Sequence, residues 1–342
     1  QQQILIFFVV PPKLRLMFTP FESFGIKFRN QILAPPTKEN LANHRGIVTG
    51  EMIRHYSALA KQGVGTMLTE SAFVARQGKM AAGQLGISEE EHLEGLEKLV
   101  KAIKKEGACI GIKLSHAGAR TSEEVCGENP VGPSLYNFGR DFDLSREFDE
   151  GDIEEIILHF VHAAERAQEV GFDFIEINGG DQLLLDQCFS VRFNNRDDDY
   201  GSETIENRLR LTCQIIQAIR DRKSVSIPIS YYFSIFDKME DGFSITDLHE
   251  TLELLEKSGV DIFHPFAVHV MNRCFDSEES LLELIGLNTE RPLVADGNIK
   301  SPQVLLDVLN IDKVQWYVLE KTLLARPNWF NFLKKKVADQ EK

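Results

Sequence analysis

Polar residues that could bind a ligand follow directly after several short apolar runs of this chain. Asn178 and Asp181 come after the run at 174–177, and two glycines separate them. An amide and a carboxylate at this spacing can orient a polar ligand, but Asn-Gly-Gly-Asp is also rich in turn-forming residues. A ligand-binding pair and a plain turn therefore both stay open.

The histidines and cysteines give little support to a metal site. His159 and His162 lie three residues apart on one predicted helix, which alone is weak evidence for metal ligands, so we expect surface side chains. His116 is expected to orient a loop, whereas His264 and His269 stay open as ligand contacts. The five cysteines are scattered and contain no Cys-x-x-Cys pair: 109, 126, 188, 213 and 274. This set predicts reduced thiols in a cytoplasmic protein without a metal centre.

The charge balance excludes some partners. Among 342 residues, 38 Lys and Arg stand against 52 Asp and Glu, a net charge of −14. Nucleic-acid binding requires clustered basic residues, so a nucleic-acid partner is not expected. The apolar run at 4–10 is seven residues long, whereas a membrane-spanning helix needs about 20. We therefore expect no membrane attachment. With nucleic acid and membrane disfavoured, the expected partner is a small-molecule ligand.

The chain alternates between two kinds of segment. Eight short, mostly apolar runs bounded by Gly, Pro or Asp predict buried strands. Amphipathic stretches lie between them, and 152–170 is a clear helix because its apolar residues recur at helical spacing. The predicted strands are 29–34, 65–70, 109–115, 173–178, 226–233, 261–267, 292–296 and 314–319.

Several helix ends carry local signals. Ser88 to Glu91 matches a capping box, and Ser301-Pro302 places a cap residue before a first-turn proline. Four glycines end helical stretches, where a left-handed backbone conformation is expected: Gly63, Gly107, Gly171 and Gly259.

Eight such units in one chain predict a single (β/α)8 TIM barrel over 17–342, after an N-terminal extension or leader at 1–16. An open doubly wound sheet is less favoured, since no G-x-G-x-x-G follows a strand. Barrel active sites lie at the carboxyl ends of the strands. The residues there are Pro35, Pro36, Thr37, Glu70, Ser71, Lys113, His116, 178–181, Tyr231, Tyr232, His264, Pro265, 296–298, Glu320 and Lys321.

Nine segments, in the order that a barrel requires, resemble the Old Yellow Enzyme family of FMN-containing NAD(P)H:flavin oxidoreductases and ene-reductases. They are FRNQILAPPT (28–37), GVGTMLTESAFV (63–74), GQLGI (83–87), IGIKLSHAGAR (110–120), VGPS (131–134), FIEIN (174–178), RDDDYG (196–201), ENR (206–208) and ADGNIKSP (295–302). The resemblance covers about 17–333 and implies FMN, NADH or NADPH as co-substrate, and a possible homo-oligomer. We expect no iron–sulfur or pyridine-nucleotide domain within these residues.

The resemblance also implies positions for the flavin ring. Pro35, Pro36 and Thr37 fall on the loop along the ring, and Thr37 could donate to a flavin carbonyl. Ser71 matches a small residue beneath the flavin. Lys113 stands where the family has a glutamine that pairs with the pyrimidine edge, and a lysine can donate there but cannot accept.

Other family positions are substituted. Tyr232 stands where the family has an arginine beside the flavin, and 224–237 contains no Arg or Lys. Glu320 and Lys321 replace the Gly-Arg pair that binds the phosphate, so Lys321 is expected as a point charge beside a carboxylate. Gly297 and Asn298 could add backbone donors to the phosphate.

The substrate positions differ as well. Asn178 and Asp181 stand where the family holds the substrate oxygen, and Leu183 stands at the proton donor's position. A carboxylate cannot stabilise developing negative charge, and leucine has no proton to give. Reduction of activated alkenes by the family mechanism is expected to fail unless a tyrosine substitutes: Tyr136, Tyr231 or Tyr232.

Two hypotheses remain. The first is an FMN-dependent NAD(P)H oxidoreductase that transfers hydride to an unidentified acceptor. The second is a derived barrel that has lost flavin redox chemistry and binds or acts on another ligand. The family-like residues favour the first hypothesis, and substitutions at four positions favour the second: Asp181, Leu183, Tyr232 and Glu320.

Overall fold

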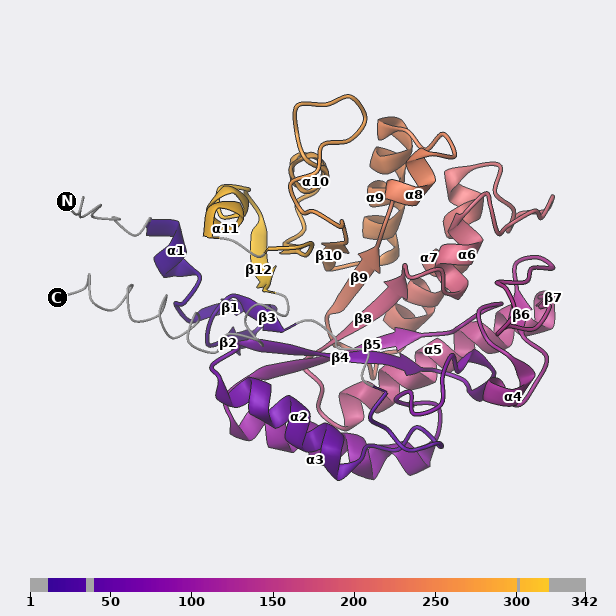
Figure 1. The fold of residues 1–342 in the computed structure, drawn as a ribbon, viewed down its shortest axis with the longest axis horizontal. Coiled ribbons are helices and arrows are strands. Elements are labelled where there is room, and N and C mark those ends of the chain that lie inside the picture. Colours follow the sequence, from indigo (N-terminus) through magenta and orange to yellow (C-terminus); the bar gives the residue numbers. More distant parts are fainter. Residues whose placement is uncertain (1–11, 35–39, 300–301, 320–342) are drawn as a thin grey trace, which may run out of the picture.

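A closed barrel of eight parallel strands forms the centre of the molecule in the computed structural model, which describes residues 12–34, 40–299 and 302–319 (Figure 1). The strands follow the order β10-β11-β12-β3-β4-β5-β8-β9 around the barrel. They are β3 Ile32–Ala34, β4 Thr66–Phe73, β5 Cys109–Ser115, β8 Phe174–Gly179, β9 Ile229–Phe233, β10 Ile262–Pro265, β11 Leu293–Ala295 and β12 Val314–Val318. The predicted TIM barrel is confirmed.

Helices surround the barrel and cover the outward faces of its strands (Figure 1). They are α1 Pro12–Leu16, α2 Gly50–Lys61, α3 Leu93–Lys105, α4 Glu123–Cys126, α5 Glu150–Glu169, α6 Leu184–Phe189, α7 Ile205–Asp221, α8 Phe236–Met239, α9 Ile245–Ser258, α10 Leu281–Asn288 and α11 Pro302–Val308. Two short 3₁₀ helices lie at Arg76–Gly78 and Glu90–His92. No helix within the described ranges is long and apolar enough to cross a membrane.

Local sequence explains most element ends. All eight predicted strands are present with shifts of a few residues at their ends, and β5 matches its prediction residue for residue. Each of the four helix-ending glycines has a positive φ, from 77° at Gly107 to 113° at Gly259. Such values are easily adopted only without a Cβ. The predicted caps at the helix starts were less accurate.

The predicted capping box at Ser88 is wrong. Glu89 is the N-cap instead, and its side chain accepts from the His92 backbone while the His92 ring accepts from Glu89 N–H. The buried imidazole thus takes the place that a glutamate was expected to fill. Ser301 lies outside the described residues, although α11 does begin at Pro302.

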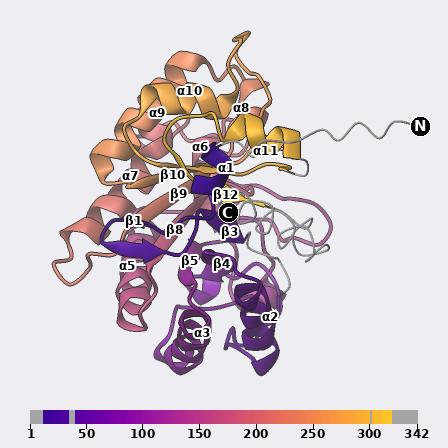
Figure 2. The ribbon, with the colours of Figure 1, turned by 90° about the vertical axis from the view of Figure 1, so that its left-hand side faces the viewer.

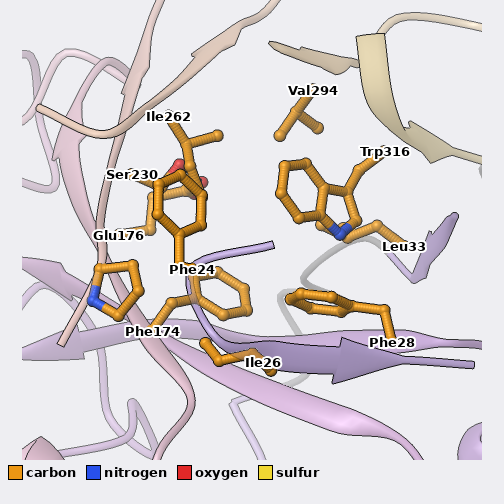
Figure 3. Close-up of a pocket in the computed structure, with 11 residues that line it drawn as sticks. Phe24, Ile26, Phe28, Leu33, Phe174, Glu176, Ser230, Ile262, Val294 and Trp316 are labelled. Atoms are coloured by element: carbon orange, nitrogen blue, oxygen red, sulfur yellow. The ribbon is translucent and has the colours of Figure 1, made fainter. Parts of the chain in front are cut away.

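A two-stranded hairpin closes the amino-terminal end of the barrel. It consists of β1 Phe21–Ser23 and β2 Ile26–Phe28 and lies across the strand starts (Figure 2). Phe28 stacks on Phe21 with ring centroids 4.9 Å apart and meets the edge of Trp316 at 5.3 Å. Phe28 and Trp316 line a cavity of about 10 Å³ that reaches Glu176 (Figure 3). The barrel is therefore sealed by apolar packing at this end.

Replacing Phe28 should show how much the hairpin contributes. Phe28 is 3% exposed, so Phe28→Ala should lower the free energy of unfolding by about 3–5 kcal/mol. Phe24→Ala is the matched control, because Phe24 is 42% exposed and should cost far less. Urea denaturation followed by circular dichroism measures both. Equal losses in the two variants would contradict this role of the packing.

Candidate active site

Charged and polar side chains gather inside the barrel toward its carboxyl end. Successive residues of a strand point to opposite faces, so only alternate positions reach the interior. On β8 these positions are Phe174, Glu176 and Asn178, which pass from the apolar end of the barrel to its mouth. Lys113 on β5 lies in register with Glu176. The strands therefore bring separate parts of the sequence to one buried cluster.

Four ionisable groups of this cluster form a chain of alternating charge. Lys113 Nζ lies 3.3 Å from Glu176 Oε1, and Glu176 Oε2 lies 2.6 Å from His264 Nδ1. His264 Nε2 lies 3.2 Å from Asp296 Oδ2. Ser230 Oγ also donates to Glu176 Oε2, at 3.1 Å. We call Lys113, Glu176, His264 and Asp296 the charge chain.

Burial and pairing determine the protonation of the charge chain. Burial raises the pKa of Glu176, but the positive charges of His264 and Lys113 outweigh it and lower that pKa to about 2. Burial lowers the pKa of His264, but the charge of Glu176 and the hydrogen bond to Asp296 raise it to about 9. At neutral pH Glu176 is therefore ionised and His264 is protonated.

Tyr232 lies over the cation of the charge chain. Its ring centroid is 3.1 Å from Lys113 Nζ, and its ring meets the edge of His264 at 5.1 Å. Burial and nearby carboxylates, of which Asp181 acts most strongly, hold the pKa of Tyr232 far above its usual value. By contrast, Tyr231 points outward, so that its hydroxyl approaches Gly179 and the α7 side of the sheet. Tyr232 is therefore a neutral phenol whose ring covers a buried ammonium.

Asn178 and Asp181 belong to a bonded loop at the rim of the mouth. Asn178 Nδ2 donates to Ser71 Oγ and to Asp181 Oδ2, both at 3.2 Å, and Asn178 Oδ1 accepts from Gly180 N–H. Arg120 donates to the Asp181 carbonyl. Asp181 has a positive φ of 60°. The turn and the ligand-site interpretations are therefore compatible, because a strained turn holds a polar pair at the mouth.

Gly297 and Asn298 follow β11 at the same end of the barrel. Gly297 has a φ of 134°, and a Cβ there would meet the Ala267 carbonyl oxygen at 2.1 Å. Asn298 donates through Nδ2 toward His269 Nδ1 at 2.8 Å, while its Oδ1 is buried without a hydrogen-bond partner among the described residues. An unpaired buried acceptor of this kind is suited to a ligand hydroxyl group.

Of the predicted site residues, the structure places Ser71, Lys113, Asn178, Asp181 and Tyr232 close together, while their roles in binding stay predictions. Five further predicted residues lie outside the described ones: Pro35, Pro36, Thr37, Glu320 and Lys321.

Glu176 was not predicted. A charged residue in the apolar run FIEIN was the available signal, because a buried carboxylate requires a partner. His264 was left open, and the structure places it in the charge chain. His159 is half-buried on α5 rather than fully at the surface.

Comparison with known proteins agrees with this geometry. The sequence model of the NADH:flavin oxidoreductase / NADH oxidase family matches residues 16–340, which is nearly the whole chain. The chain belongs to this family. The resemblance to Old Yellow Enzyme is thereby confirmed, and membership implies FMN as cofactor and NADH or NADPH as reductant.

Individual relatives support the same conclusion. The chain is 32% identical to an NADPH dehydrogenase of Clostridium acetobutylicum, over 90% of this chain and 92% of that protein. It is also 32% identical to an NADH oxidase of Thermoanaerobacter brockii over 89% of this chain, but spans only 48% of that relative. The Old Yellow Enzyme of Trypanosoma cruzi shares the fold, with a TM-score of 0.82 at 17% identity, covering 94% of this chain and 93% of that one.

The residues at the mouth fit the ring and sugar parts of FMN. Lys113 would supply a positive charge to a ring that gains negative charge on reduction, and the aromatic ring of Tyr232 lies beside that charge. The Oδ1 of Asn298, which has no partner within the described part of the chain, suits a hydroxyl of the ribityl chain. The phosphate positions Glu320 and Lys321 belong to the residues that the structure does not describe.

The charge chain should make stability depend on pH. The folded-state pKa of His264 is raised to about 9 from 6.5, so its stabilisation is complete below pH 6.5 and is lost as pH rises through 9. The free energy of unfolding should fall by roughly 3 kcal/mol across this interval. Urea denaturation at a series of pH values measures the fall.

His264→Gln should remove this fall, because the variant has no imidazolium to lose. His162→Gln is the control, since His162 is exposed on α5, and it should keep the wild-type pH dependence. A His264→Gln profile as steep as that of the wild type would contradict the assignment.

Proposed function

We propose that this barrel is an FMN-dependent NAD(P)H oxidoreductase that passes hydride to a small-molecule acceptor at its mouth. The observation that carries the proposal is the ammonium of Lys113, which is buried and lies 3.1 Å from the Tyr232 ring centroid. The Old Yellow Enzyme family has an arginine on the strand that bears Tyr232, whereas 224–237 of this chain contains no Lys or Arg. Lys113 provides a positive charge at that place from β5 instead.

Different residues of this chain would contact different parts of the cofactor. Lys113 and Tyr232 would contact the ring, with Ser71 beneath it, and Gly297 and Asn298 would contact the sugar–phosphate chain. When bound, FMN supplies a carrier that accepts hydride from a nicotinamide and passes it to an acceptor. Glu176 and His264 hold Lys113 in place, and the barrel walls exclude water from its ammonium.

The substrate side supports an acceptor other than the usual activated alkenes. Asp181 presents a carboxylate where a hydrogen-bond donor is needed, and Leu183 is buried at 2% exposure. Loss of a positioned proton donor commonly reduces a rate about 10²–10⁴-fold. Standard ene reduction is therefore a poor match to this mouth.

A second candidate is a barrel that has lost flavin chemistry and binds another ligand. It is favoured by the ring of Tyr232, which is 7% exposed and covers Lys113. It is also favoured by the negative charges of Asp181 and Asp296, which add to burial in raising the pKa of Tyr232. The two candidates differ in whether FMN is bound.

The five cysteines support a reducing compartment, because each is a free thiol and four of them are buried. We propose a cytoplasmic location on this ground. A homo-oligomer stays a prediction.

Flavin titration distinguishes the two candidates. The purified apoprotein should bind FMN with quenching of flavin fluorescence, and NADH or NADPH should bleach the visible absorption of the complex without oxygen. Cyclohexenone turnover should be at least about 10²-fold slower than the bleaching, since no donor stands at Leu183. A protein that leaves FMN fluorescence unchanged would support the second candidate, and rapid cyclohexenone turnover would contradict the substrate-side argument.

A further inference from the structure

The charge chain is unusual because it is buried where a barrel interior is normally filled by branched apolar side chains. Lys113, Glu176 and His264 are each at most 2% exposed, and Asp296 is 8% exposed. Taking a charge out of water costs several kcal/mol per ion, so such groups persist only when their neighbours compensate them. Stability alone would be served as well by apolar residues.

The charge chain extends from the closed end of the barrel interior to the mouth. At its inner part, Glu176 reaches the cavity beneath the barrel floor, among Phe174, Ile262 and Trp316 (Figure 3). At its outer parts, Lys113 meets Tyr232, and Asp296 begins the loop that carries Gly297. The anion at the centre is therefore shielded from solvent, while a cation and an anion stand at the mouth.

The pairing pattern links the two outer groups. Glu176 is shared by Lys113 and His264 through different oxygens, and His264 is shared by Glu176 and Asp296 through different ring nitrogens. Removing one charge thus changes the compensation of every other one. A change at Asp296 reaches Lys113 only through two intervening groups.

We propose that Lys113 sets the midpoint potential of FMN bound at the mouth. Glu176, His264 and Asp296 are positioning residues that hold the Lys113 ammonium in place and determine how strongly its charge acts on the bound ring. The inference rests on the proposed function, because it concerns FMN. A buried cation favours a bound ring in its negatively charged, reduced state. Each carboxylate of the chain opposes that preference, and each cation adds to it.

This arrangement predicts opposite effects from neighbouring substitutions. Lys113→Gln removes a cation and should weaken the affinity for reduced FMN relative to oxidised FMN by about tenfold, which lowers the midpoint potential by about 30 mV. Asp296→Asn removes an anion and should raise the potential. Glu176→Gln removes an anion and also the charge that keeps His264 protonated, so it should change the potential less than Asp296→Asn does. A merely structural role would weaken binding in all three variants without a change of sign.

The experiment uses the full chain reconstituted with FMN. The dissociation constant of oxidised FMN is measured by fluorescence, and the midpoint potential by anaerobic titration against a reference dye. Lys113→Arg is the conservative control and should stay near the wild-type potential. Asp296→Asn keeps the test possible if Glu176→Gln fails to fold, since Asp296 lies at the outer end of the chain.

The outcomes separate the two proposals. A wild-type protein that binds no FMN overturns the proposed function and this inference with it. A wild-type protein that binds FMN, with potentials that move in one direction or stay unchanged in all variants, overturns this inference alone. A lower potential in Lys113→Gln and a higher one in Asp296→Asn support it.

Discussion

The structure depends on keeping the members of the charge chain paired inside a barrel that is closed at one end. Glu176 is 1% exposed and touches both Lys113 and His264, so its carboxylate is tolerated only while both partners remain cationic. The same burial that makes the pairing obligatory also makes each charge strongly felt at the mouth, because little water screens it. Stability and chemistry therefore depend on one set of contacts.

Two features of the barrel keep these charges paired and buried. One is the register of its strands, and the other is the apolar closure of one end. Lys113 and Glu176 are register partners on β5 and β8, so backbone hydrogen bonding alone places ammonium and carboxylate side by side. At the other end, Phe28 and Trp316 close the strand starts with aromatic packing. These rings cover the apolar end of the interior beneath Glu176. An apolar floor and a charged mouth are thus two parts of one arrangement.

Most of the fold could be predicted from the sequence, because strand length, helical periodicity and glycine caps are local signals. The site was harder to predict from the sequence. Asn178, Tyr232 and Lys113 could be found because they stand at strand ends, but the role of Glu176 depends on a partner 63 positions away, by numbering, in a neighbouring strand. The Ser88 prediction failed for a related reason: a buried histidine satisfied the helix start from a position where a glutamate was expected.

The substitution at Tyr232 has a different meaning once side chains from several strands are considered together. Counted along one strand, the loss of a basic residue removes the charge that the site requires. In a barrel, however, interior positions of different strands converge on one axis, so a cation on β5 can stand against a ring on β9 across the intervening β8. The place of a charge inside the barrel therefore does not depend on which strand carries it. A comparison made one strand at a time therefore misses the contact between Lys113 and Tyr232.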